Sequence, residues 1–319
     1  MGVDGHPVVR AVVLCPGQGA QRVGMGQDLA ERFPAARAVF AEADAALDYP
    51  LSRLMWDGPE AELTLTHNAQ PAILVHSLAV HAVVRERLDA VAGAGHSLGE
   101  YTAYAAVGAL GLPDAVRLVR RRGELMLDAG ARRPGTMAAV IGMDGDRVVE
   151  ICASVSTGDA VVVAANLNAP DQTVISGDPV AVERAGNALR EAGARRVLPL
   201  KVSGAFHSPL MAPAQEGLTA ALDAVALDDP AAPVIANASA EPVREARQAR
   251  RLLAEQLTAP VRWVASMRCA AALADGAPFV ELGPGNVLAG LLKRIVPGAA
   301  AVSLGTAAEV DAFLAQGLA

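Results

Sequence analysis

The sequence predicts an α/β fold, in which a body built on a parallel sheet carries a smaller inserted unit. Apolar runs typical of buried strands alternate with helix-favouring segments along most of the 319 residues. A glycine-flanked serine stands between one such run and a helix, and the middle of the chain changes to a β-α-β-β-α-β order. Together these observations predict one α/β body with an insertion.

The first strand is expected over residues 8–15, where only Arg10 interrupts an apolar run. It leads into the glycine-rich turn Pro16-Gly17-Gln18-Gly19-Ala20-Gln21. A dinucleotide motif would need glycine where Arg22 stands, and a phosphate loop would need a Gly-Lys-Ser/Thr ending that is missing here. Two interpretations remain. The segment is a plain strand-to-helix turn, or its backbone N–H groups and the Gln18 side chain face a pocket.

Helices are expected over residues 28–47 and 68–88, the second with Pro71 in its first turn. The next apolar stretch runs into Gly95-His96-Ser97-Leu98-Gly99, which matches G-x-S-x-G, and then into a helix over residues 100–107. Strand, turn and helix in this order are the setting of the nucleophile elbow in α/β hydrolase-like enzymes. Ser97 is therefore a candidate nucleophile, and the alternative is a serine that only caps the helix.

A further helix, expected over residues 113–129, contains four arginines, and their spacing places them on different faces of the helix. Arg122 has apolar neighbours three and four residues away on both sides, whereas the neighbours of Arg117 and Arg120 at this spacing include charged residues. Arg122 is therefore expected on the apolar face, where a guanidinium is costly unless acceptors meet it. Either it forms an ion pair with a protein acid, or it is a fork for a substrate carboxylate.

Residues 135–203 predict a ferredoxin-like βαββαβ subdomain, and residues 1–134 and 204–319 predict the α/β hydrolase-like body. Within the subdomain, strands are expected over 136–141, 160–165, 172–176 and 196–201, and helices over 144–154 and 179–192. Between its second and third strands, Asn166-Leu167-Asn168-Ala169-Pro170 is expected to form a turn. The asparagines either favour the turn alone, or their amides reach a neighbouring cleft.

The segment after the subdomain places His207 on a loop between a strand and a proline-started helix. Loop residues held by rigid elements are common catalytic groups, although a single histidine can also be structural. Because Ser97 needs a base, His207 is the candidate. The rest of the chain alternates again, with strands expected over 234–236, 279–282 and 300–304 and helices over 244–257, 261–273, 287–295 and the C-terminal segment.

Composition limits the possible functions. A net charge of −7 argues against binding nucleic acid through the overall field. No uncharged apolar run reaches ~18 residues, so no membrane span is expected, and residues 1–6 lack the pattern of a signal peptide. The cysteines Cys15, Cys152 and Cys269 lie far apart without metal-ligand spacing, and we expect them to be reduced in a cytoplasm.

The candidate residues indicate acyl transfer through a serine ester. Serine is a poor nucleophile at its ordinary pKa, so a base such as His207 must take its proton. The developing oxyanion needs preorganised donors, and at an elbow one of them is the backbone N–H of the next residue, Leu98. The turn at Gln18 is the natural source of the second donor. These residues alone leave hydrolysis and transfer open.

Several motifs occur in the order found in malonyl-CoA:acyl carrier protein transacylases, and the chain resembles that family over about residues 8–305. The family includes the enzyme of fatty-acid synthesis and the discrete acyltransferases of polyketide assembly lines. The motifs are Pro16-Gly17-Gln18-Gly19-Ala20-Gln21, Gly95-His96-Ser97-Leu98-Gly99-Glu100, Arg121-Arg122-Gly123, Asn166 to Gly177, Gly204-Ala205-Phe206-His207-Ser208, Glu255-Gln256-Leu257 and Glu281-Leu282-Gly283-Pro284-Gly285.

The resemblance implies a role for each matching position. Ser97 is the acylated nucleophile, His207 is its base, and Arg122 holds the malonyl carboxylate. The backbone N–H groups of Gln18 and Leu98 form the oxyanion hole.

Three further positions match the family. The backbone carbonyl of Gln256 orients His207 in place of the acid of a Ser-His-Asp triad. Phe206 resembles the malonyl-preferring form, in which bulk beside the site disfavours an α-methyl group. Asn166 belongs to the substrate pocket.

The implied reaction is ping-pong. Malonyl-CoA acylates the serine, CoA leaves, and the phosphopantetheine thiol of holo acyl carrier protein takes the malonyl group. Malonyl-CoA and the phosphopantetheine group are substrates, and no metal or organic cofactor is expected. We expect a cytoplasmic monomer that binds neither nucleic acid nor membrane. The alternatives are a serine hydrolase of acyl thioesters or esters, and a transacylase for a substituted malonyl unit in polyketide synthesis.

Overall fold

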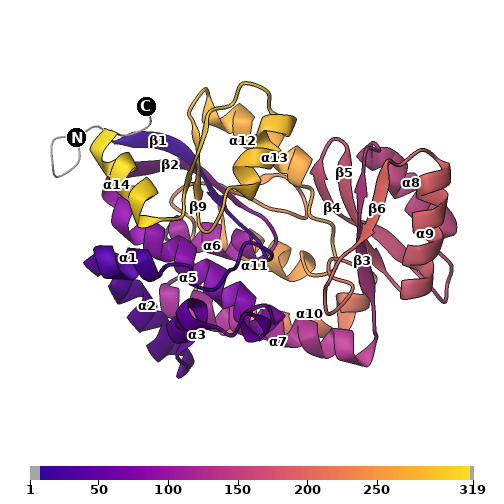
Figure 1. Ribbon diagram of the computed structural model, residues 1–319, viewed down its shortest axis with the longest axis horizontal. Helices are drawn as coiled ribbons and strands as arrows, with labels where there is room; N and C mark the ends of the chain where they lie inside the picture. The colour runs from indigo at the N-terminus through magenta and orange to yellow at the C-terminus, as the bar shows by residue number, and fades with distance from the viewer. Residues whose placement is uncertain (1–7, 317–319) are drawn as a thin grey trace.

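The computed structural model describes residues 8–316, and its strands form two separate sheets (Figure 1). Residues 1–6, on which the signal-peptide expectation rests, lie outside this range, as do the last three residues of the expected body. The first sheet has the strand order β10-β9-β1-β2-β7-β8 and the second β4-β5-β3-β6. In the described part of the chain, no helix has the length and apolar character to cross a bilayer.

The six-stranded sheet is parallel except for β8, which runs antiparallel to β7. Side chains of β1 alternate between two apolar clusters, with Val13 in one cluster and Leu14 in the other. Both faces are therefore covered, which explains the continuous apolar run. The strands are β1 (Val9–Cys15), β2 (Leu88–Gly95), β7 (Val234–Ile235), β8 (Pro242–Val243), β9 (Phe279–Leu282) and β10 (Ala301–Leu304). The two-residue β8 was not predicted, since so short a strand leaves no periodicity to detect.

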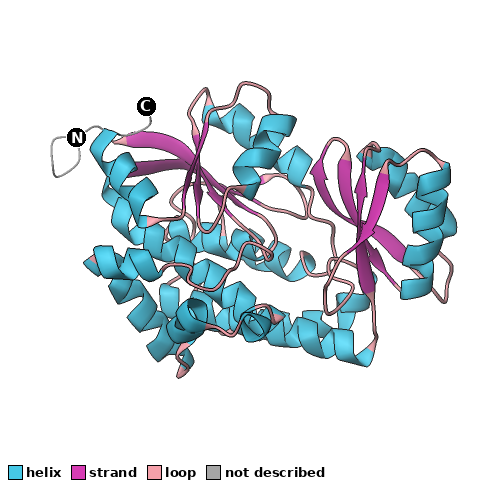
Figure 2. Ribbon diagram, viewed as in Figure 1, coloured by secondary structure: helices cyan, strands magenta, loops and turns pink. Residues whose placement is uncertain are grey.

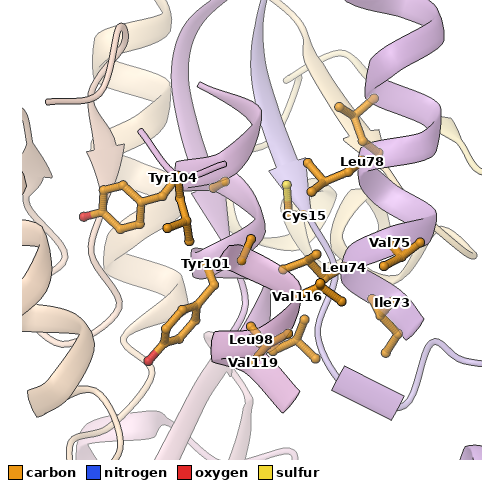
Figure 3. Packing of buried hydrophobic residues seen from close by; sticks show 14 of the residues in the cluster. Cys15, Ile73, Leu74, Val75, Leu78, Leu98, Tyr101, Tyr104, Val116 and Val119 are labelled. Atoms are coloured by element: carbon orange, nitrogen blue, oxygen red, sulfur yellow. The ribbon is translucent and has the colours of Figure 1, made fainter. Parts of the chain in front are cut away.

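Helices cover the two faces of this sheet as separate layers (Figure 2). On one side lie α5 (Thr66–Val84), α6 (Leu98–Ala106) and α7 (Leu112–Arg132), and on the other lie α12 (Trp263–Ala274) and α13 (Val287–Ile295). Figure 3 shows side chains of the first layer, among them Leu74, Leu98 and Val116, gathered beside Cys15 of β1. The body also contains α10 (Ala212–Asp223), α11 (Ala246–Glu255) and α14 (Ala307–Gln316).

The N-terminal helices differ from the prediction. The single helix expected over residues 28–47 is two helices, α1 (Gln27–Arg32) and α2 (Pro34–Leu47). Phe33 between them is extended (φ −118°, ψ 117°), because a proline disfavours helical geometry in the residue before it. The short helices α3 (Leu51–Asp57) and α4 (Glu60–Leu63) were not predicted.

Pro71 lies inside α5 and not in its first turn, because the helix begins at Thr66. A proline has no N–H to donate to the carbonyl four residues earlier, here that of His67. Nη1 of Arg120 in α7 donates to this carbonyl instead, at 3.2 Å. A neighbouring helix thus makes the proline tolerable within α5.

The four-stranded sheet confirms the predicted βαββαβ unit. It is antiparallel, and α8 and α9 pack on one face around an apolar cluster. On the other face, Met137 and Val174 join the core of the body. The elements are β3 (Thr136–Ile141), α8 (Gly145–Val155), β4 (Val162–Ala169), β5 (Gln172–Gly177), α9 (Pro179–Glu191) and β6 (Arg196–Pro199).

The expected turn at residues 166–170 is wrong. Asn166 and Asn168 are part of β4, and the turn to β5 is confined to Pro170 and Asp171. Register shifts in the pairing of β4 with β5 let the strand continue through the asparagines, which turn-forming propensity alone did not predict.

Candidate active site

Ser97 occupies a sharp turn between β2 and α6, with a positive φ of 53° and ψ of −109°. The flanking glycines make this turn possible: a Cβ at Gly95 would lie 1.9 Å from the carbonyl oxygen of Gly99. Asn237 supports the turn from outside. Its Oδ1 accepts the N–H of Ser97 at 2.8 Å, and its Nδ2 donates to the carbonyl of Gly95 at 2.7 Å. Such strain persists only where neighbouring groups hold it.

The Ser97 side chain does not cap α6, so the capping interpretation is wrong. Its Oγ lies 2.8 Å from Nε2 of His207. Nδ1 of His207 lies 2.9 Å from the backbone carbonyl of Gln256. A carbonyl only accepts, so Nδ1 carries the proton and Nε2 is free to receive one from the serine.

His207 is buried, and the burial, reinforced by the charge of Arg122, lowers its pKa to about 3. The imidazole is therefore neutral at neutral pH. A neutral imidazole bonded to a serine hydroxyl is the arrangement required for general-base activation.

Arg122 is 1% exposed and faces only neutral acceptors. Its Nη1 donates to Oε1 of Gln70 at 2.6 Å, and its Nη2 donates to Oγ of Ser97 and Oε1 of Gln256, both at 3.0 Å. Among residues 8–316, no carboxylate lies within 4.0 Å of this guanidinium, so the interpretation as an ion pair with a protein acid is wrong. The cleft thus holds a positive charge, beside the serine, without a protein counter-ion in contact.

These groups open into one cavity of about 730 Å³ between the two sheets. Its wall includes Met137 and Val174 from the smaller sheet, and His96, whose Nε2 lies 2.8 Å from Oδ1 of Asn168. Every predicted site residue lines the cavity except Gln256, which lies fully buried behind it. The lining residues predicted from the sequence are Gln18, Ser97, Leu98, Arg122, Asn166, Phe206 and His207.

Sequence reasoning missed three residues that support the site: Gln70, Glu100 and Asn237. Gln70 is a buried polar residue in an otherwise apolar stretch of α5, and that contrast was a usable signal. Asn237 follows the carboxyl end of β7, where ligand-binding residues of parallel sheets gather. Glu100 was visible only as part of the elbow motif.

The fold and the site define a class: enzymes that form an acyl ester on an elbow serine, with histidine as the base. The acyl transferase domain family matches residues 12–314. Relatives that cover 88–95% of the chain at 37–46% identity are malonyl CoA-acyl carrier protein transacylases, and the chain belongs to that branch of the family.

Relatives and solved structures agree with this membership. The chain is 46% identical over 284 residues to the malonyl CoA-acyl carrier protein transacylase of Bacillus subtilis (strain 168), covering 88% of this chain and 89% of that protein. The acyl carrier protein S-malonyltransferase of Vibrio cholerae superposes with a TM-score of 0.89 at 40% identity, over 95% of this chain and 99% of that one. A malonyl-transacylase in complex with its type II PKS acyl carrier protein gives a TM-score of 0.90 at 39% identity, over 97% and 99%.

Proposed function

We propose that this enzyme transfers the malonyl group of malonyl-CoA to the phosphopantetheine thiol of an acyl carrier protein. The observation that carries the proposal is the position of Arg122. Its guanidinium is buried without a contacting protein acid, and its Nη2 lies 3.0 Å from Oγ of Ser97. A planar guanidinium binds a carboxylate with two parallel hydrogen bonds. In malonyl-CoA one methylene separates the free carboxylate from the thioester carbonyl, so a single acyl group can engage both the arginine and the serine.

In the first half-reaction, Nε2 of His207 takes the proton of Ser97 as Oγ attacks the thioester carbonyl. Gln18 and Leu98 both line the cavity, and we assign their backbone N–H groups to the stabilisation of the oxyanion. The carbon–sulfur bond then breaks, CoA leaves with the proton from His207, and malonyl-serine remains.

In the second half-reaction, the thiol of phosphopantetheine gives its proton to Nε2 of His207 and attacks the malonyl-serine carbonyl. The Ser97 oxygen leaves and takes that proton back, which regenerates the free enzyme. Each step exchanges one acyl bond for another without net oxidation. Because His207 supplies the base, and Arg122 and the backbone N–H groups supply the charge stabilisation, we propose that the reaction uses no metal and no organic cofactor.

The rival function is hydrolysis of an acyl thioester or ester on the same serine. A hydrolase of simple acyl groups has no use for the charge of Arg122, which is why transfer is favoured. Mixing the enzyme with malonyl-CoA and holo acyl carrier protein, followed by intact-mass analysis, tests the choice. We expect malonyl-carrier protein to accumulate. Free malonate and CoA without a loaded carrier would establish hydrolysis instead.

We further propose that residues 135–203 act as the domain that closes one wall of the cavity, since Met137, Asn166 and Val174 line it. We also propose a cytoplasmic location. Cys15, Cys152 and Cys269 are free thiols, and reduced cysteines are typical of that compartment.

The low pKa of His207 predicts how the reaction responds to pH. The base is active when neutral, so kcat/KM falls only as pH drops toward the lowered value of about 3. We expect no acid limb near 6.5, the ordinary pKa of histidine, when kcat/KM is measured between about pH 5 and 8.

Burial also raises the pKa of Glu100 to about 7, so the profile is measured in the Glu100→Gln variant as well. A limb that this substitution removes belongs to Glu100. A limb near 6.5 that survives it would contradict the assignment of His207 as a base with a lowered pKa.

Phe206 lines the cavity beside the base and is 7% exposed, and we propose that its ring limits the size of the acyl group. Phe206→Ala should raise the ratio of methylmalonyl to malonyl kcat/KM by about tenfold, since one missing steric contact is worth ~1–3 kcal/mol. Competition between the two CoA esters, read by the mass of the loaded carrier protein, measures this ratio. An unchanged ratio would show that another wall of the cavity sets the preference.

A further inference from the structure

Glu100 is a buried carboxyl group to which the reaction described above gives no role. It is the third residue of α6 and is fully buried. Its Oε2 accepts two hydrogen bonds, from the backbone N–H of Asn237 at 2.9 Å and from Nε2 of Gln256 at 2.7 Å. A carboxyl group is costly to bury, and these two bonds connect it to Asn237, which holds the elbow, and to Gln256, which holds His207.

Gln256 connects that carboxyl group to the reacting residues. Its backbone carbonyl holds Nδ1 of His207 at 2.9 Å, and its Oε1 receives Nη2 of Arg122 at 3.0 Å. Its Nε2 donates both to Glu100 and to the backbone carbonyl of Ser97, at 2.9 Å. The two acceptors determine which end of the amide carries nitrogen, so the amide oxygen must face the guanidinium.

The same arrangement places Glu100 and Arg122 at the two ends of one neutral amide. Nε2 of Gln256 donates to Glu100, and Oε1 of Gln256 accepts from Arg122, so the two residues are linked through hydrogen bonds of Gln256. This link needs an acceptor oxygen at Glu100 and does not need a full negative charge there. The contacts of the guanidinium remain neutral groups that a substrate carboxylate can replace.

We propose that Glu100 is a positioning residue for malonyl transfer: its Oε2 locks the amide of Gln256, and Gln256 holds His207 and Arg122 in place around Ser97. The inference rests on the proposed function. Its distinctive consequence is that the effect of Glu100 on His207 and Arg122 passes through Gln256, so the side chains of Glu100 and Gln256 should behave as one unit in the kinetics.

A double-mutant cycle tests this consequence. Glu100→Ala and Gln256→Ala are each expected to lower kcat/KM for malonyl transfer about 10- to 100-fold, the range for losing a buried charged hydrogen bond. The double variant should lie within about threefold of the worse single variant, because residues that act as a unit are not additive. A double variant that loses the product of the two single effects would overturn the proposal, since a merely structural role is additive.

Conservative variants distinguish the loss of the Glu100 hydrogen bonds from a general loss of structure. Glu100→Gln offers an amide oxygen to the same two N–H groups and should stay within about threefold of wild type. Glu100→Asp keeps the charge, but its shorter side chain cannot reach both partners, so kcat/KM should fall about tenfold. If Glu100→Ala does not fold, Glu100→Asp takes its place in the double-mutant cycle. Equal losses in Glu100→Gln and Glu100→Ala, or wild-type kinetics in Glu100→Ala, would contradict the positioning role.

A matched control and a second readout complete the test. Glu255 precedes Gln256 but is paired with Arg251 at 2.7 Å on the surface, so Glu255→Ala should leave kcat/KM unchanged.

Because His207 serves every acyl group, Glu100→Ala should lower kcat with acetyl-CoA as well as with malonyl-CoA. If wild-type enzyme failed to load a carrier protein, the proposed function itself would be wrong. Loading with wild-type kinetics in Glu100→Ala would reject only the role of Glu100.

Discussion

Ser97→Ala is expected to abolish the malonyl-enzyme adduct and to lower kcat/KM for transfer by at least about 10⁴-fold. Losses of that order follow when the nucleophile of a serine–histidine pair is removed, because the covalent route is closed. Intact-mass analysis after mixing with malonyl-CoA detects the adduct directly. The variant should fold, since alanine removes only the hydroxyl and the elbow remains held by Asn237.

Ser203 provides the matched control for this substitution. It also borders the cavity, but its Oγ lies 3.2 Å from Oγ1 of Thr66 and has no histidine partner. Ser203→Ala should therefore still form the adduct. An adduct that persists in Ser97→Ala would place the nucleophile elsewhere and would refute the mechanism proposed here.

The sequence predicted well those parts of the fold that local patterns determine. The apolar run of β1 predicted a strand covered on both faces, and the glycines around Ser97 predicted the elbow. Arg122 was placed on a buried face by the spacing of its neighbours, and burial confirms that placement. In each of these cases the responsible signal lies within a few residues of the feature.

The partners of those residues could not be predicted in the same way. Gln70 meets Arg122 from another helix, and Asn237 meets Ser97 from the end of the neighbouring strand β7, so neither contact leaves a local pattern. The side-chain contact of Gln256 was missed for the same reason. The resemblance implied a role only for its backbone carbonyl, whereas its side-chain amide also contacts Arg122. Such contacts depend on how distant segments pack.

Arg122→Ala is expected to lower kcat/KM for malonyl transfer by about 10²- to 10³-fold, since truncating one partner of a buried charge pair costs ~2–5 kcal/mol. Acetyl-CoA has no carboxylate, so acetyl loading should fall much less. Some loss is expected there too, because Nη2 of Arg122 also donates to Ser97 and Gln256. The measurement is the ratio of malonyl to acetyl kcat/KM, which should collapse.

Arg121 is the control for this prediction because it lies on the same helix but faces solvent, where it pairs with Glu124 at 3.5 Å. Arg121→Ala should leave the ratio unchanged. Arg122→Lys keeps the charge but presents a point donor in place of a planar fork, so its ratio should fall between those of wild type and alanine. Equal losses for malonyl and acetyl groups in Arg122→Ala would show that the guanidinium serves Ser97 and Gln256 rather than the substrate. The arginine would then be part of the catalytic scaffold, and the choice between malonyl transfer and simple ester hydrolysis would have to rest on the acceptor alone.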